Sequence, residues 1–196
     1  MDFYSHVFKA FNNLAEMFEY RARNDSSQIE NVEFIRKLVQ DGLRDYISKK
    51  AIFNIDNKDS LRLICHFGSK FKASDIKKYF EDDSFKLYIL IIQEKTNLMN
   101  MKGIDGLPLN IQIFDLKELQ FNITKHRFVP RHDVIFDQEE IDSIMTRFKI
   151  KSKNQLPLIL KTDAMARYLN LQPGQIVKIT RHSPTCGEHI IYRYCA

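Results

Sequence analysis

The amino-acid sequence predicts an α/β domain followed by a small α+β domain. Apolar residues recur at helical spacing near the N-terminus, and short β-forming runs then alternate with a helical segment. With 196 residues, of which 44% are hydrophobic, the chain is long enough for two packed cores. We expect residues 1–125 to form the first domain and residues 126–196 to form the second.

Two helices are expected at the start of the first domain. From Phe3 to about Tyr20, apolar residues spaced by four and three share one helical face, namely Phe3, Val7, Phe11, Leu14 and Phe18. The polar stretch from Arg21 to Glu30 predicts a loop. Helical spacing then returns and predicts a second helix through Val32, Ile35, Leu38, Val39 and Leu43.

A small parallel or mixed sheet covered by helices is expected next. Leu61–Phe67 and Phe85–Ile92 are short runs rich in β-forming residues, and Ser74 is placed to cap a helical piece between them. Leu109–Phe114 predicts a further strand, after a loop that contains Gly103, Gly106 and Pro108.

The second domain begins after a connector. Residues 121–133 show no period and predict an ordered connector, after which Asp137 and Glu140 resemble a capping box that opens a helix. A strand is expected at Leu156–Leu160, and Thr162 is the expected cap of a short helix. A β-turn centred on Pro173-Gly174 then leads to two final strands, Gln175–Arg181 and Glu188–Tyr194.

Charge and cysteine content restrict the function classes. The 30 Lys and Arg residues against 25 Asp and Glu residues give a net charge of +5, which favours acidic partners but falls short of an arginine-rich nucleic-acid binder. The three cysteines form no paired framework and the start of the chain has no signal-like apolar run, so we expect a reducing intracellular compartment. No apolar stretch approaches the roughly 20 residues of a membrane span, and no membrane partner is expected.

The C-terminal residues resemble one family over some forty positions in a single register. The resemblance rests on Leu156-Pro157-Leu158-Ile159, Thr162-Asp163, Ala166-Arg167-Tyr168, Leu171, Pro173-Gly174-Gln175-Ile176-Val177-Lys178-Ile179, Arg181, Ser183 and Ile191-Tyr192-Arg193. They are similar to the C-terminal signature of the fifth subunit shared by the eukaryotic RNA polymerases and of its shorter archaeal counterpart. Residues 122–132 resemble the linker of the same family.

Some positions depart from the family pattern. Ala164 stands where the family usually has Pro, and Pro184, Cys186 and Glu188 replace the commoner residues of the last hairpin. These departures and the looser match of the N-terminal portion resemble the version that large cytoplasmic DNA viruses encode.

The resemblance implies a non-catalytic subunit of a multisubunit DNA-dependent RNA polymerase, with no cofactor or metal of its own. Residues 1–125 would be an α/β N-terminal jaw domain near downstream duplex DNA. Residues 126–196 would be a small α+β assembly domain, similar to the archaeal counterpart and docked on the largest subunit, among the other polymerase subunits. The location would be the nucleus for a cellular protein, or the host cytoplasm and virion for a viral one.

The signature residues that the resemblance assigns to partner docking form one set. They are Asp163, Arg167, Tyr168, Pro173, Gly174, Gln175, Val177, Arg181, Ile191, Tyr192 and Arg193. From residue chemistry alone, Arg167 suits fixing a loop or meeting a partner carboxylate, and Tyr168 suits filling the small core.

Two alternative functions depend on other residues. A stand-alone magnesium-dependent nuclease would use Gln93-Glu94-Lys95 at a strand end. It would also need an Asp on a neighbouring strand, but Asp56 and Asp59 lie in a polar loop before Leu61, which disfavours this function. A stand-alone DNA-binding factor would use basic patches at Lys70, Lys72, Lys77, Lys78, Lys95, Lys102 and Arg147–Lys153.

A zinc site is disfavoured. His182, Cys186, His189 and Cys195 lie near one another in the sequence and are all possible zinc ligands. Because side chains alternate between the two faces of a strand, however, these four are not expected to converge.

Overall fold

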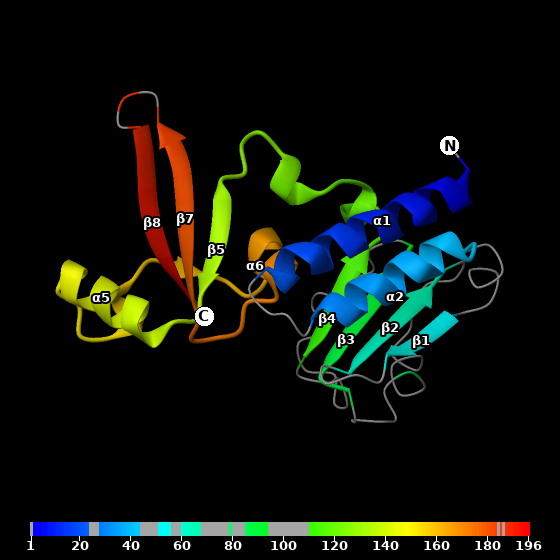
Figure 1. Cartoon of the computed structure of the whole chain (residues 1–196), viewed down its shortest axis with the longest axis horizontal. Coiled ribbons are helices and arrows are strands. Elements are labelled where there is room, and N and C mark those ends of the chain that lie inside the picture. The colour runs from blue at the N-terminus through cyan, green and yellow to red at the C-terminus, as the bar shows by residue number, and fades with distance from the viewer. Residues whose placement is uncertain are drawn as a thin grey trace. The chain divides into compact units, whose positions relative to one another are not determined.

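The computed structural model describes residues 2–23, 28–43, 51–55, 60–67, 79, 85–93, 110–183, 185 and 187–196. The chain forms two compact units, Met1–Phe121 and Asn122–Ala196, each with its own helices and sheet (Figure 1). The fold is therefore mixed α/β. Within the described ranges, the structure contains no helix with the length and apolarity needed to cross a membrane.

The N-terminal unit opens with two helices, α1 (Phe3–Ala22) and α2 (Ile29–Gln40). Both lie over the same face of the first sheet (Figure 1). The predicted apolar face of α1 is confirmed, since Val7, Phe11, Leu14 and Phe18 are fully buried. The predicted face of α2 is confirmed at Val32, Ile35 and Leu38.

The end of α1 was predicted wrongly. Arg21 was assigned to a loop because it begins a polar stretch, yet it lies in the last turn of α1 and is only 5% exposed. Its guanidinium group donates a hydrogen bond of 2.8 Å to Oε1 of Gln112 and lies 5.0 Å from the centre of the Phe18 ring. Burial at this position is stabilised by a polar partner from a distant strand, which local spacing does not reveal.

The first sheet has four strands in the order β1-β2-β3-β4, namely Ala51–Ile55, Leu61–His66, Leu87–Ile92 and Ile111–Asp115. β1 pairs with β2 antiparallel, and the other two pairs are parallel, so the predicted mixed sheet is confirmed. β1 was not predicted. Of the helical piece predicted after Ser74, only Tyr79 lies within the described residues, and the loop with Gly103, Gly106 and Pro108 lies outside them.

The central strand β3 is buried along its whole length, as expected for a strand covered on both faces. On one face, Tyr88, Leu90 and Ile92 pack with Ile64 and Tyr79. On the other face lies Gln112 of β4, paired with Ile89 and bonded to Arg21 of α1. After β4, the short 3-10 helix η3 (Glu118–Gln120) contacts α1, because Asn13 donates a hydrogen bond of 2.7 Å to the carbonyl oxygen of Leu119.

The C-terminal unit contains a second sheet in the order β5-β7-β8-β6. These strands are β5 (Arg131–Ile135), β6 (Leu158–Ile159), β7 (Ile176–Ser183) and β8 (Gly187–Cys195). The helices are α5 (Gln138–Phe148) and α6 (Ala164–Leu169), with short 3-10 helices η4 (Ile123–Lys125) and η5 (Lys153–Gln155).

Two local predictions in this unit need correction. Residues 131–133 were assigned to a connector but begin β5, which pairs antiparallel with β7 and is held by that distant partner. The cap of α6 is Asp163 rather than Thr162, because the Asp163 carboxylate accepts from the backbone N–H of Met165 at 2.8 Å. Asp137 caps α5 as expected, but its carboxylate accepts from the N–H of Glu139 at 3.1 Å and not from that of Glu140, as the expected capping box would require.

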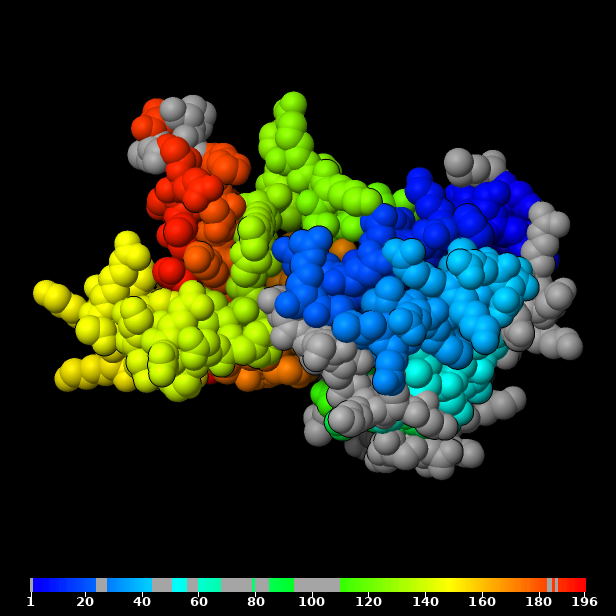
Figure 2. Space-filling view, viewed as in Figure 1, coloured from blue at the N-terminus to red at the C-terminus, as the bar shows by residue number. Residues whose placement is uncertain are grey.

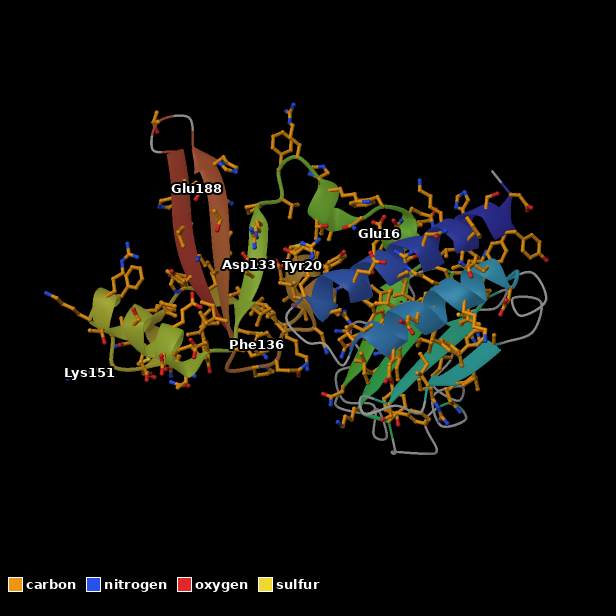
Figure 3. The ribbon with its side chains drawn as sticks, viewed as in Figure 1. Glu16, Tyr20, Asp133, Phe136, Lys151 and Glu188 are labelled. Atoms are coloured by element: carbon orange, nitrogen blue, oxygen red, sulfur yellow. The ribbon has the colours of Figure 1, made fainter. Side chains whose placement is uncertain are left out.

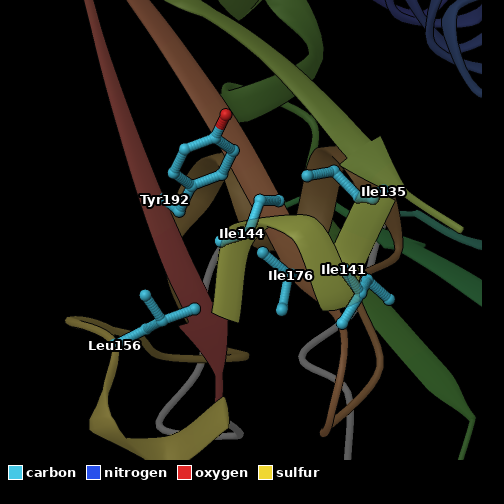
Figure 4. Packing of buried hydrophobic residues seen from close by; sticks show 6 residues of the cluster. All are labelled: Ile135, Ile141, Ile144, Leu156, Ile176 and Tyr192. Carbon is cyan, nitrogen blue, oxygen red and sulfur yellow. The ribbon is translucent and has the colours of Figure 1, made fainter. Parts of the chain in front are cut away.

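The core of the C-terminal unit lies between α5 and one face of the sheet. Ile141 and Ile144 of α5 pack with Ile135, Leu156, Ile176 and Tyr192 (Figure 4). We call this face of the sheet the α5 face. Since side chains alternate along each strand, every second residue of β5, β7 and β8 belongs to it.

Candidate docking surface

α5 covers only part of the α5 face, and the remainder forms an open groove. The groove has a volume of about 710 Å³. Its floor includes Lys178 and Thr180 of β7 and Ile190 of β8, and the segment Arg127–Pro130 lines it as well. Figure 3 labels two further lining residues, Asp133 on β5 and Glu188 on β8.

The groove carries more positive than negative side chains. Arg127, Arg131, Lys178 and Arg181 line it, against Asp133 and Glu188. Arg131 forms an exposed ion pair with Asp133, with 2.9 Å between Nε and Oδ2. Such exposed pairs contribute little to stability.

Exposed apolar side chains lie around the same sheet. Phe128 is 74% exposed, and the Arg127 guanidinium lies 4.6 Å from the centre of its ring. Leu158 of β6 and Leu160, which directly follows that strand, are both exposed, Leu160 by 61%. Ile190 of β8 is also exposed. Phe128 and Ile190 line the groove, whereas Leu158 and Leu160 lie at the opposite, β6 edge of the sheet. Exposed apolar side chains with charged residues around them, as at Phe128 and Ile190, are typical of a protein-docking surface.

The opposite face of the sheet holds a buried histidine. His132 of β5 is only 6% exposed, and its Nδ1–H donates a hydrogen bond of 2.7 Å to the carbonyl oxygen of Pro130. Burial lowers the pKa of His132, and the bond to Pro130 and the nearby Asp163 and Asp133 offset this effect in part. The ring is therefore neutral at pH 7.

Two cysteines are buried and weakly reactive. Cys195 at the end of β8 exposes none of its surface, and Cys65 of β2 is 1% exposed. Burial raises the pKa of both thiols, so little thiolate forms at neutral pH.

Several of the predicted signature residues hold the C-terminal unit together. Asp163 caps α6, and the Tyr168 hydroxyl donates to Oδ1 of Asn122 at 3.1 Å. Gly174 has a φ of 94° in the turn after Pro173, a conformation that favours glycine. The turn is closed by a hydrogen bond of 3.1 Å from the N–H of Gln175 to the carbonyl oxygen of Gln172.

The other signature residues divide between core and surface. Val177 is fully buried and Tyr192 is 8% exposed, while Arg167, Ile191 and Arg193 are half-buried. Nη1 of Arg193 donates to the carbonyl oxygen of Leu158 at 2.9 Å and thereby fixes β6 beside β8. Arg181 is exposed and lines the groove.

The residues of the alternative functions are largely outside the described part of the chain. Glu94, Lys95, Asp56 and Asp59 of the nuclease hypothesis lie outside it, as do Lys70, Lys72, Lys77, Lys78 and Lys102. Cys186 lies outside it as well. Among the residues that are described, no group of three or more His, Cys, Asp or Glu side chains converges to hold a metal ion.

Sequence reasoning missed Phe128, Leu160 and the groove. The groove depends on β5, which the sequence pattern did not identify, and on the point at which α5 stops covering the sheet. A large apolar residue within a stretch without helical or strand period, such as Phe128, is a signal that could have indicated a surface contact.

Comparisons with known proteins relate this unit to one family. A family model described as "RNA polymerase Rpb5, C-terminal domain" matches residues 121–195. A subunit of DNA-directed RNA polymerases I, II, and III from Dictyostelium discoideum, rpabc1, is 30% identical over 159 residues, which covers 78% of this chain and 80% of that protein.

Two further relatives are similar. Subunit 5A of DNA-directed RNA polymerase V from Arabidopsis thaliana is 29% identical over 153 residues, covering 76% of this chain and 68% of that protein. The subunit RPABC1 of DNA-directed RNA polymerases I, II, and III from Caenorhabditis elegans is 47% identical over 76 residues, covering 39% of this chain and 35% of that protein.

Proposed function

The chain belongs to the family of the fifth subunit of DNA-directed RNA polymerases, and from this premise we propose that it supports polymerase assembly without catalysing a reaction itself. The observation that carries the proposal is the alignment with the Dictyostelium discoideum subunit, which spans 80% of that protein. The partners are then other polymerase subunits.

Residues 126–196 serve as the assembly domain in this proposal, docked on the largest subunit. Two features support that role: a groove with an excess of positive side chains, and the exposed apolar residues Phe128 and Ile190 that line it. The eleven signature residues contribute mainly by shaping this surface. Among them, Arg181 is exposed in the groove and contacts the partner directly.

Residues 1–125 serve as the jaw domain beside downstream duplex DNA. The 159 residues aligned with the Dictyostelium discoideum subunit are more than twice the length of the segment 121–195, so the similarity extends into the N-terminal unit. That unit has its own buried mixed sheet and helices, which suits a rigid arm. The location is the nucleus for a cellular source, and the host cytoplasm and virion for a viral one.

Cross-linking tests the docking partner. The polymerase complex that contains the tagged chain is treated with an amine-reactive cross-linker, and linked peptides are identified by mass spectrometry. Lysines of the C-terminal unit, such as Lys151, Lys161 and Lys178, should link to the largest subunit. Links from these lysines to other subunits alone would contradict the assignment of the largest subunit.

A further inference from the structure

Over most of its length, one edge of β8 has no strand beside it in the described part of the chain. β7 pairs with β8 from Tyr194 to Gly187, whereas β6 pairs only with Tyr194 and Cys195. Within the described residues, the outer edge of β8 from Gly187 to Arg193 therefore pairs with no strand of this chain. Figure 2 shows the red atoms of β8 at the outer margin of the C-terminal unit, above the yellow atoms of α5.

The direction of the free backbone groups follows from the ladder. The N–H of Tyr194 points toward β6 and bonds to the carbonyl oxygen of Pro157 at 2.9 Å. The N–H of Cys195 points the other way and bonds to the carbonyl oxygen of Gln175 at 2.8 Å. Because these directions alternate along a strand, the N–H and C=O groups of Tyr192, Ile190 and Glu188 point away from β7, along the open edge.

Pro157 explains why β6 does not extend further along β8. In the parallel register of β6 and β8, the next hydrogen bond would run from the N–H of residue 157 to the carbonyl oxygen of Tyr192. Proline has no N–H, so this bond cannot form, and the residues that precede it form η5 instead of a longer strand. The strand position beside Tyr192, Ile190 and Glu188 is therefore unoccupied by described residues of this chain, and we call it the vacant lane.

We propose that this vacant lane accepts an extended segment of another polymerase subunit as a fifth strand of the sheet. The inference rests on the proposed function and adds that the partner segment is an extended strand. An alternating row of free N–H and C=O groups at the spacing of a pleated strand matches an extended backbone, and it does not match a helix.

The side chains beside the lane define the chemistry of that segment. Ile190 and Tyr192 lie on the α5 face, close to the exposed Leu158, and favour apolar residues on that side of the incoming strand. His189 and Arg193 lie on the opposite face and favour acidic residues there. The expected segment alternates apolar and acidic residues.

A backbone substitution tests the proposal. Ile190→Pro removes an N–H that points into the lane while leaving the hydrogen bonds between β7 and β8 intact, and proline is tolerated where the N–H of an edge strand faces solvent. The matched control, Ile190→Val, keeps the N–H. We expect Ile190→Pro to bind the two large polymerase subunits about tenfold or more weakly than the control, at an unchanged circular dichroism spectrum.

Hydrogen exchange supplies an independent measurement. In the wild-type complex, the amides of Ile190 and Tyr192 should be protected from exchange, and they should exchange rapidly in the free protein. A folded Ile190→Pro variant that binds like the control, or amides that stay unprotected in the complex, would overturn the proposal while leaving polymerase membership intact. Failure of the wild type to bind any polymerase subunit would instead contradict the proposed function.

A second copy of the chain is the competing occupant of the lane. Two β8 edges could pair with each other, in which case the free wild type would sediment as a dimer and Ile190→Pro as a monomer. We expect both to sediment as monomers, and a dimer that depends on the N–H of Ile190 would contradict the proposal.

Discussion

At the residue scale, His132 couples the stability of the C-terminal unit to pH. Its ring is buried, and burial lowers its pKa in the folded state below the ordinary value of about 6.5. The unfolded chain therefore binds a proton at a higher pH than the folded chain does. The stabilisation that comes from keeping His132 neutral is complete above about pH 6.5, and it is lost as the pH falls from there toward the pKa of His132 in the folded state.

This coupling gives the first prediction. The free energy of unfolding of the wild type, measured by urea denaturation with circular dichroism, should decrease between about pH 6.5 and pH 5. His132→Gln removes the titrating group, so the variant should lose stability overall but show a shallower decrease over the same interval. An equally steep decrease in the variant would mean that other groups cause the effect.

At the element scale, the bond between Arg21 and Gln112 joins α1 to β4. Both side chains are buried, and a hydrogen bond to a charged donor contributes about 1.5–3 kcal/mol. We therefore expect Gln112→Ala to lower the free energy of unfolding of the N-terminal unit by roughly that amount. Asn110→Ala, at an exposed turn before β4, is the control and should cost far less.

Hydrogen exchange of amides in the first sheet reports the stability of the N-terminal unit separately from that of the C-terminal unit. Amides of β3 and β4 should exchange faster in Gln112→Ala than in Asn110→Ala. Equal exchange in the two variants would show that the bond to Arg21 does not hold α1 on the sheet.

The sequence correctly predicted the features that depend on residues close to one another along the chain. The apolar spacing of α1, the Asp137 cap of α5 and the turn at Pro173-Gly174 are all found as expected. Elements held by distant partners were missed: β1 needs β2, β5 needs β7, and the burial of Arg21 needs Gln112. Neither periodicity nor propensity reveals such a partner.

The candidate site was predictable only in part, for the same reason. The family signature lies in the same unit as the groove, but signature residues such as Asp163, Tyr168 and Gly174 act within the fold. The exposed groove and the open edge of β8 depend on how strands from separate segments pair. They emerge only once the sheet order is known.

At the scale of the whole molecule, the chain consists of two units that can make separate contacts. Each has its own sheet and its own buried core, so each can carry a separate contact within a larger assembly. In the proposed arrangement, the C-terminal unit docks the chain on the polymerase and the N-terminal unit reaches toward DNA.

The most direct test of the central claim is the composition of the complex around the chain. The tagged protein is purified from its native or infected cells at moderate salt, and co-purifying proteins are quantified by mass spectrometry. We predict recovery of the two large polymerase subunits in amounts close to that of the tagged chain. Repeated recovery of the chain without polymerase subunits would contradict the account.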